Sequence, residues 1–215
     1  MNRKPFERPG RVRGETGLEY PQFALFRKPF SFKLASIAIL ILFIAASCGG
    51  KTSLKGVVFP SISPAADISL TDHHGLPFKL SSLQGRVVLV FFGFTNCTTE
   101  CPLTLALIRQ SLDSTGTASR DVVVVMVSTD PLNDTPAAMQ AFMGKFNPAF
   151  LGLLGTPAEL AKAWQDYAVL VSEDGETHSS LTYVVDKKGN LRETFSPESS
   201  SDDIASDLKI LLAEK

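Results

Sequence analysis

Two uninterrupted apolar runs constrain the fold of this chain more than any other feature. Residues 87–92 and 122–127 contain only Val, Leu, Phe and Met. Such runs are typical of parallel strands whose two faces are both covered. Between them, Leu105, Ile108 and Leu112 recur at helical spacing and predict one buried helix face. A strand, a helix and a strand in this order predict a right-handed crossover and a parallel strand pair.

The segments around this core predict two hairpins and further helices. One helix start carries a capping box, with Thr156 as the N-cap and Glu159 three residues later. The expected elements are hairpins at 68–80 and 181–195, a helical turn at 81–85, a short buried segment at 150–154, and helices beginning near 135, 156 and 202. This order predicts the α/β class, as a thioredoxin-like fold with an N-terminal β-hairpin extension and an extra helical insertion.

The N-terminal region predicts a targeting segment. Residues 34–46 form a run of 13 residues without a charge, whereas a helix that spans a bilayer needs about 20 apolar residues. The residues before this run carry a positive excess, as in a signal peptide. Cys48 follows Ala-Ala-Ser, which is similar to a bacterial lipobox, where the cysteine is acylated. An uncleaved short anchor is the alternative, and without either role Cys48 is a small apolar residue.

We therefore expect a lipoprotein signal peptide at 1–47, a Gly-, Ser- and Pro-rich tether at 48–64 and a thioredoxin-like domain at 65–215. Residues 48–215 carry 13 Lys and Arg against 19 Asp and Glu. This balance excludes nucleic acid as a partner, because nucleic-acid binding needs a basic surface. A lipoprotein signal also predicts that the domain lies at the extracytoplasmic face of a bacterial membrane, in the periplasm or cell envelope. There a cysteine pair persists as a disulfide or is kept reduced by a dedicated donor.

Cys97 and Cys101 follow the first apolar run and are the only cysteines in the expected domain. Their spacing in the first turn of a helix brings both side chains to one face, and the helix N-terminus favours a thiolate. Pro102 fits this turn, because its missing N–H needs no partner there. A passive disulfide would close a very short loop and stabilise the fold little. The pair therefore indicates either thiol–disulfide exchange or half of a metal site.

A histidine is the candidate for a third metal ligand. His73 and His74 are adjacent in the first hairpin turn, where we expect solvent exposure instead of metal binding, because neighbours on an extended chain point in opposite directions. His178 precedes the strand expected at 181–185. In a thioredoxin-like fold, the loop that enters this strand passes beside the cysteine helix. Two thiolates and one imidazole suit Cu(I) and hold Cu(II) with added ligands, whereas structural zinc usually takes a fourth protein ligand.

The sequence resembles the SenC/Sco family, which consists of copper-binding proteins that help to assemble the Cu(A) centre of cytochrome c oxidase. The resemblance runs from about residue 67 to the C-terminus. The motifs that carry it are, in order, Ser69-Leu70-Thr71-Asp72, Gly85-Arg86-Val87-Val88-Leu89, Phe92-Gly93-Phe94-Thr95, Cys97-x-x-x-Cys101-Pro102, Ser128-Thr129-Asp130-Pro131 with Asp134-Thr135-Pro136, Leu151-Gly152-Leu153-Leu154-Gly155-Thr156-Pro157, His178-Ser179-Ser180 and Tyr183-Val184-Val185-Asp186.

The resemblance implies a copper metallochaperone. It places copper on Cys97, Cys101 and His178, with Asp130 near the site as an outer-shell or partner-facing acid. The expected partners are the Cu(A) subunit of the oxidase, a thioredoxin-like reductant, and the membrane through a lipid on Cys48. Between the cysteines the chain departs from the family pattern, because Thr98 stands where proline is common.

Two alternatives remain at this point. The protein could be a thiol–disulfide reductase of the copper-site cysteines in the oxidase, with Cys97 as the nucleophile and Cys101 as the resolving thiol. Such exchange would be a thiol–disulfide oxidoreductase activity. A peroxiredoxin is the second alternative, but that class is marked by Pro-x-x-x-Thr-x-x-Cys. Val90 and Phe94 occupy the proline and threonine positions here.

Overall fold

The two apolar runs form the central strands of one mixed sheet. The computed structural model describes residues 53–172 and 179–215. Strands β4 (Val87–Gly93) and β5 (Val122–Ser128) are buried along their whole length and pair in parallel. Helix α2 (Glu100–Thr115) connects them. The predicted strand–helix–strand unit is therefore confirmed.

Further strands and helices complete the thioredoxin-like arrangement around this unit. In the described part of the chain the sheet has eight strands, in the order β1-β8-β7-β4-β5-β6-β2-β3. The outer strands are β1 (Val57–Pro64), β2 (Ser69–Asp72), β3 (Pro77–Lys79), β6 (Leu151–Leu154), β7 (Thr182–Val185) and β8 (Asn190–Phe195). The other helices are α3 (Pro136–Gly144), α4 (Pro157–Asp166) and α5 (Ser201–Ala213), with short 3-10 turns at Leu80–Leu83 and Gly116–Asp121. This confirms the predicted fold class.

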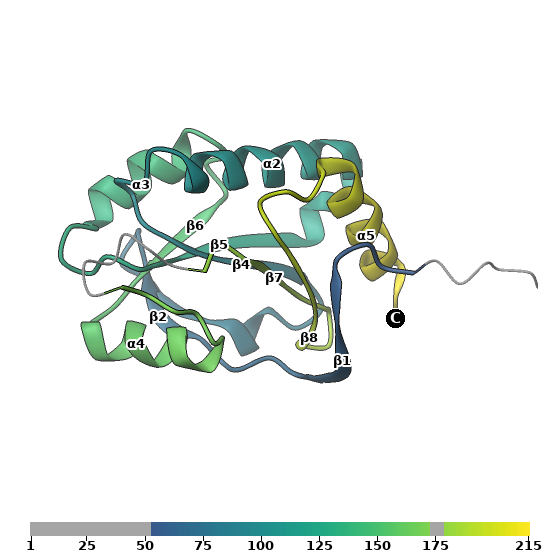
Figure 1. The fold of residues 1–215 in the computed structure, drawn as a ribbon, viewed down its shortest axis with the longest axis horizontal. Coiled ribbons are helices and arrows are strands. Elements are labelled where there is room, and N and C mark those ends of the chain that lie inside the picture. Colours follow the sequence, from purple (N-terminus) through teal and green to yellow (C-terminus); the bar gives the residue numbers. More distant parts are fainter. Residues whose placement is uncertain (1–52, 173–178) are drawn as a thin grey trace, which may run out of the picture. The chain divides into compact units, whose positions relative to one another are not determined.

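Helices cover both faces of the sheet, which explains why its central strands are apolar throughout. Figure 1 shows α2, α3 and α5 on one side of the sheet and α4 on the other. Leu89 and Phe91 of β4 belong to the core beneath α2, α3 and α5. Val90 and Phe92, which point the opposite way, pack in a second core with residues of α4 and of the β2–β3 hairpin. The C-terminal ends of β4 and β5 carry the loops that hold the candidate site.

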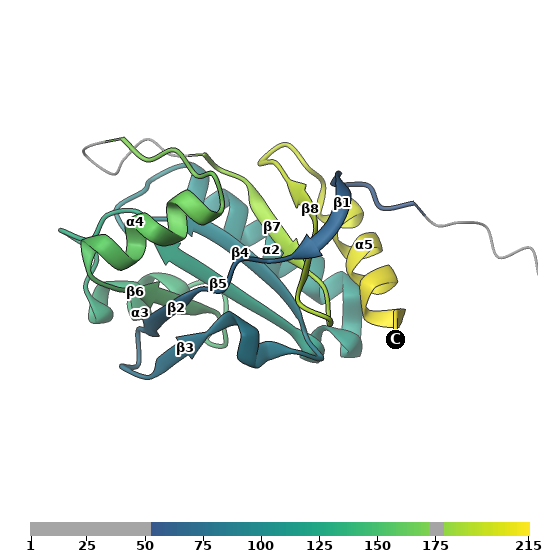
Figure 2. The ribbon, with the colours of Figure 1, turned by 90° about the horizontal axis from the view of Figure 1, so that it is seen from below.

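The folded domain begins before residue 65, its predicted start. Strand β1 takes up residues that we assigned to the tether and pairs antiparallel with β8 (Figure 2). The backbone N–H groups of Lys55 and Gly56 also donate to Asp207 Oδ2 on α5, at 2.5 and 3.0 Å. Cys48 and the predicted signal peptide lie outside the described residues. Among the helices of the described residues, none has the length and apolar character that crossing a bilayer requires.

The β2–β3 turn is less exposed than predicted. His73 is buried, with 6% of its surface accessible, whereas His74 is exposed as expected. His73 Nδ1 accepts a hydrogen bond from the Gly152 N–H at 2.9 Å. Burial, followed by the charge of His74, lowers the pKa of His73. The expectation of a fully solvated turn was wrong for His73, because β2 pairs with β6 and brings the turn against that strand.

Replacing Gly152 by alanine is expected to lower the free energy of unfolding by about 1–3 kcal/mol. A Cβ at this position of β6 would overlap the side chain of Met139 on α3, so this side chain must change its rotamer or the helix must move away from the sheet. Urea unfolding measures the effect. Gly144→Ala is the matched control, because a Cβ there meets nothing within 4 Å. Equal unfolding midpoints for the two variants would contradict the close approach of α3 to β6.

Candidate functional site

The candidate site lies where β4 runs into α2. Cys97 occupies the loop between these elements, and its N–H donates to the Phe94 carbonyl at 3.3 Å. Helix α2 begins at Glu100, so Cys101 lies in its first turn. The Cys101 N–H donates to Cys97 Sγ at 3.3 Å. The Cys97 sulfur therefore satisfies a backbone N–H at the start of α2, where the helix dipole favours negative charge.

The two thiols have different environments. Cys97 is partly exposed, Cys101 is completely buried, and no disulfide joins them. Burial alone would raise the pKa of Cys97, but hydrogen bonds from the backbone and thiol of Cys101, and from the Thr99 and Glu100 N–H groups, outweigh it and lower the pKa. For Cys101, burial followed by the hydrogen bond to Cys97 raises the pKa well above its ordinary value. Cys97 is therefore the accessible and more acidic thiol, whereas the buried Cys101 stays protonated.

A glycine makes room for the buried sulfur. A Cβ on Gly93, the last residue of β4, would lie 2.9 Å from Cys101 Sγ and 2.8 Å from the ring of Phe91. Any larger residue at this position would displace the thiol. The glycine at position 93 is therefore needed for the observed position of the Cys101 sulfur.

The loop that follows the predicted histidine reaches the start of α2. His178 itself lies outside the described residues. Ser180, two residues later, donates its hydroxyl hydrogen to Glu100 Oε2. Leu170 and Ser179 hydrogen-bond to each other on the two sides of the undescribed segment 173–178. Among the described residues, no group of three or more His, Cys, Asp or Glu side chains is arranged to hold a metal ion.

Asp130, the predicted outer-shell acid, lies in the loop after β5 and is engaged within that loop. Its carboxylate accepts from Asn133 Nδ2 at 2.8 and 3.1 Å, and its own N–H donates to Ser128 Oγ at 3.2 Å. Asp134, in the same loop, makes the hydrogen bonds that reach the cysteine loop. Sequence analysis assigned no role at the site to Asp134. Its position within Asp-Thr-Pro, directly before the N-cap of α3, was the available signal.

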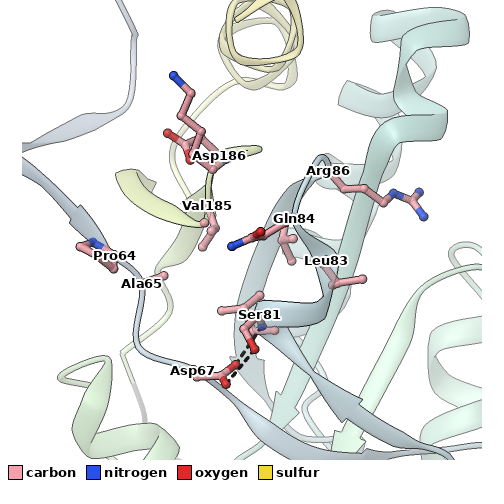
Figure 3. A pocket seen from close by; sticks show the side chains of 13 residues that line it. Pro64, Ala65, Asp67, Ser81, Leu83, Gln84, Arg86, Val185 and Asp186 are labelled. Atoms are coloured by element: carbon pink, nitrogen blue, oxygen red, sulfur yellow. Dashed lines mark hydrogen bonds between the residues drawn. The ribbon is translucent and has the colours of Figure 1, made fainter. Parts of the chain in front are cut away.

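A separate cavity lies at the other end of the central strands (Figure 3). It has a volume of about 270 Å³ and is lined by Val88, near the start of β4, and by Val185, at the end of β7. Cys97 follows the opposite end of β4. The Asp67 carboxylate in this cavity accepts hydrogen bonds from the Ser81 N–H at 2.8 Å and hydroxyl at 3.0 Å. The cavity is therefore distinct from the thiol site.

Known proteins similar to this chain include copper-bound structures. Copper-bound ScoI from Bradyrhizobium japonicum is 33% identical, with a TM-score of 0.61 over 69% of this chain and 99% of that one. BsSco, described as a cytochrome c oxidase assembly protein with a disulfide switch, is 26% identical, with a TM-score of 0.61 over 75% of this chain and 100% of that one. A SCO1/SenC family lipoprotein from Bacillus anthracis is 27% identical, with a TM-score of 0.63 over 74% of this chain and 99% of that one.

Sequence comparison leads to the same family. A SCO2-like protein from Rickettsia felis is 28% identical over 158 residues, which cover 69% of this chain and 77% of the relative. The family model described as SCO1/SenC matches residues 63–213, from the end of β1 to the end of α5. This match includes both cysteines and most of the chain. The chain therefore belongs to the SCO1/SenC family.

Proposed function

We propose that this protein is a copper metallochaperone that binds one copper ion through Cys97, Cys101 and His178. The observation that carries the proposal is the Cys97 thiol, which is accessible, has a lowered pKa and lies against the N-H groups that open α2. A second sulfur lies directly beneath it. Two thiolates are soft ligands that favour Cu(I), and an imidazole extends the set to Cu(II). The copper-bound relative supports copper as the cargo.

The Ser180–Glu100 hydrogen bond supports His178 as the third ligand. Consecutive Cα atoms are about 3.8 Å apart, so two residues of chain span less than about 8 Å. Ser180 is fixed to the residue before Cys101. A ligand two residues before Ser180 would be within reach of the first turn of α2, which supports the choice of His178 in the proposed set.

The proposed client is the Cu(A) subunit of cytochrome c oxidase. The oxidase assembly role of BsSco supports this client. We further propose that residues 1–47 are a lipoprotein signal and that an acylated Cys48 holds the domain at the extracytoplasmic membrane face, as the lipoprotein relative suggests. A thioredoxin-like protein would keep Cys97 and Cys101 reduced there.

Thiol–disulfide reduction is the second candidate function. The unequal thiols favour it, because an accessible, acidic Cys97 is suited to attack and the buried Cys101 to resolve the mixed disulfide. The disulfide switch of BsSco also supports redox use of the pair. Copper binding separates the two functions. Titration of the reduced protein with Cu(I) and Cu(II), followed by absorption and electron paramagnetic resonance, should give one copper per chain, and absence of binding would exclude the metallochaperone.

Replacing His178 by alanine is expected to lower the copper affinity at least tenfold, about 1.4 kcal/mol. The reason is the loss of one of three proposed ligands, and competition with a chelator of known affinity measures the change for each oxidation state. His74→Ala is the matched control, because this exposed histidine lies in the β2–β3 turn. Unchanged Cu(I) and Cu(II) affinities in the His178 variant would rule out the three-ligand site.

A further inference from the structure

A buried carboxylate connects the loop of Cys97 to the loop after β5. Asp134 is 8% exposed. Its Oδ1 accepts from the Thr95 N–H at 2.9 Å and from the Thr95 hydroxyl at 2.6 Å. Its Oδ2 accepts from the Ser128 hydroxyl at 2.5 Å. One side chain thus bridges Thr95, two residues before Cys97, and Ser128, the last residue of β5.

This bridge acts on the backbone that places the accessible sulfur. Thr95 lies between Phe94, whose carbonyl accepts the Cys97 N–H, and the remainder of the cysteine loop. A second hydrogen bond links the ends of the same two strands, from the Thr129 N–H to the Gly93 carbonyl at 2.9 Å. Hydrogen bonds to a charged acceptor are about twice as strong as neutral ones. Asp134 therefore makes two strong contacts that restrain the conformation of the cysteine loop at Thr95.

We propose that Asp134 is a positioning residue that holds Cys97 Sγ over the first turn of α2 and thereby stabilises the dithiol form relative to the disulfide. In the dithiol form, Cys97 Sγ accepts the Cys101 N–H. Forming the disulfide joins the two sulfur atoms and releases two protons and two electrons to an acceptor such as an oxidised thioredoxin-like protein. Disulfide formation gives up the hydrogen bond that holds the Cys97 thiol in the dithiol form. A firmly held thiol therefore disfavours oxidation, whereas a thiol on a loosened loop is oxidised more readily.

The proposal deepens the proposed copper function, since the same two sulfur atoms are the proposed ligands. Asp130 lies four residues before Asp134 in the same loop but has no described hydrogen bond to the cysteine loop. Asp134 is consequently the acid through which the loop after β5 affects the thiols. The reduction potential of the cysteine pair reports on this role without copper.

Asp134→Ala is expected to shift the dithiol–disulfide equilibrium at least tenfold toward the disulfide, which equals about 30 mV toward a more negative potential. Redox titration against thioredoxin or glutathione buffers measures the shift. Asp134→Asn should restore most of the parent value, because its amide oxygen still accepts from Thr95 and its amide N–H can donate to the Ser128 hydroxyl. Thr95→Val, which removes one hydrogen bond, should shift the potential in the same direction by a smaller amount.

Asp186→Ala is the matched control for simple destabilisation. Asp186 is also a buried loop carboxylate that accepts backbone N–H groups, but it follows β7 at the end of the sheet away from the cysteines. This variant should lose stability and keep the parent potential. If Asp134→Ala also keeps the parent potential, Asp134 is merely structural and the proposal is wrong. If Asp134→Ala fails to fold, an unchanged potential in Thr95→Val has the same meaning.

Copper binding distinguishes failure of this proposal from failure of the proposed function. A parent protein that binds copper, with unchanged potential and unchanged Cu(II) spectrum in Asp134→Ala, would refute only the positioning role. A parent that binds no copper but shows the shift in potential would refute the metallochaperone and leave the positioning role supported.

Discussion

Serine at position 97 is expected to lower the affinity for Cu(I) at least a hundredfold, about 2.7 kcal/mol, while the fold stays stable. A hydroxyl is a hard, protonated group and a poor ligand for Cu(I). The serine oxygen can nevertheless accept the Cys101 N–H that Cys97 Sγ accepts in the parent, so the first turn of α2 keeps its partner. Anaerobic competition with a Cu(I) chelator measures the affinity, and urea unfolding measures the stability. Parent-like copper affinity in Cys97→Ser would contradict the proposed site.

The same variant, paired with Cys101→Ser, separates the two candidate functions. In a reductase, the Cys97 thiolate attacks a partner disulfide and releases one partner thiol, and Cys101 then attacks the mixed disulfide to release the second. Cys101→Ser should therefore accumulate a mixed disulfide with an oxidised dithiol peptide, whereas Cys97→Ser should form none. A protein that binds copper and forms no such adduct would act as a metallochaperone alone.

Local sequence pattern was sufficient for the central elements of the fold and insufficient for its edges. Strands β4 and β5 were predicted because their apolar character reflects burial on both faces, which any neighbouring helices would impose. The capping box of α4 is likewise a local signal, and the structure contains both of its hydrogen bonds. Strand β1 was missed because its stability comes from pairing with β8, more than 120 residues later, and its prolines and serines are typical of a linker.

Side-chain direction decided what could be predicted of the site. The spacing of Cys97 and Cys101 predicted both in the first turn of a helix. In the structure only Cys101 lies on α2, and Cys97 lies in the loop before it. The difference between their pKa values could not be predicted, since it depends on which of the two sulfur atoms is buried and which accepts backbone hydrogen bonds. Asp134 was missed for the same reason. Its sequence context indicates only the start of α3, and its link to Thr95 arises where β4 and β5 end side by side.

A pair of buried carboxyl groups between β8 and α5 leads to the remaining prediction. Glu193 and Asp207 are both completely inaccessible to solvent. Asp207 Oδ2 accepts the N–H groups of Lys55 and Gly56, which suits this residue to carry the negative charge. Neither carboxylate oxygen of Glu193 accepts a well-formed hydrogen bond from the described residues. A proton on Glu193 would convert two facing acceptors into a donor and an acceptor.

The buried pair predicts a stability that declines as the pH rises. Burial, followed by the charge of Asp207, raises the pKa of Glu193 to about 8. The neighbouring Arg192 offsets only part of this, since its guanidinium pairs with Asp186 and Glu214. In an unfolded chain the carboxyl group titrates at about pH 4.3. Between that pH and about 8, the folded protein retains a proton that the unfolded chain releases, so unfolding becomes easier by up to about 1.4 kcal/mol per pH unit.

Glu193→Gln is expected to remove this decline and to stabilise the protein at pH 8 by about 2–4 kcal/mol. The neutral amide can donate to Asp207 at every pH, whereas Glu193 must keep a proton to do so. Near pH 4.5 the two proteins should have similar stability, because Glu193 is protonated in the folded chain and still about half protonated in the unfolded chain there. Urea unfolding from pH 4.5 to 9 tests this, with exposed Glu198→Gln as the control that should follow the parent. If Glu193→Gln shows the same pH dependence as the parent, Glu193 is already ionised in the folded protein and the shared proton does not exist.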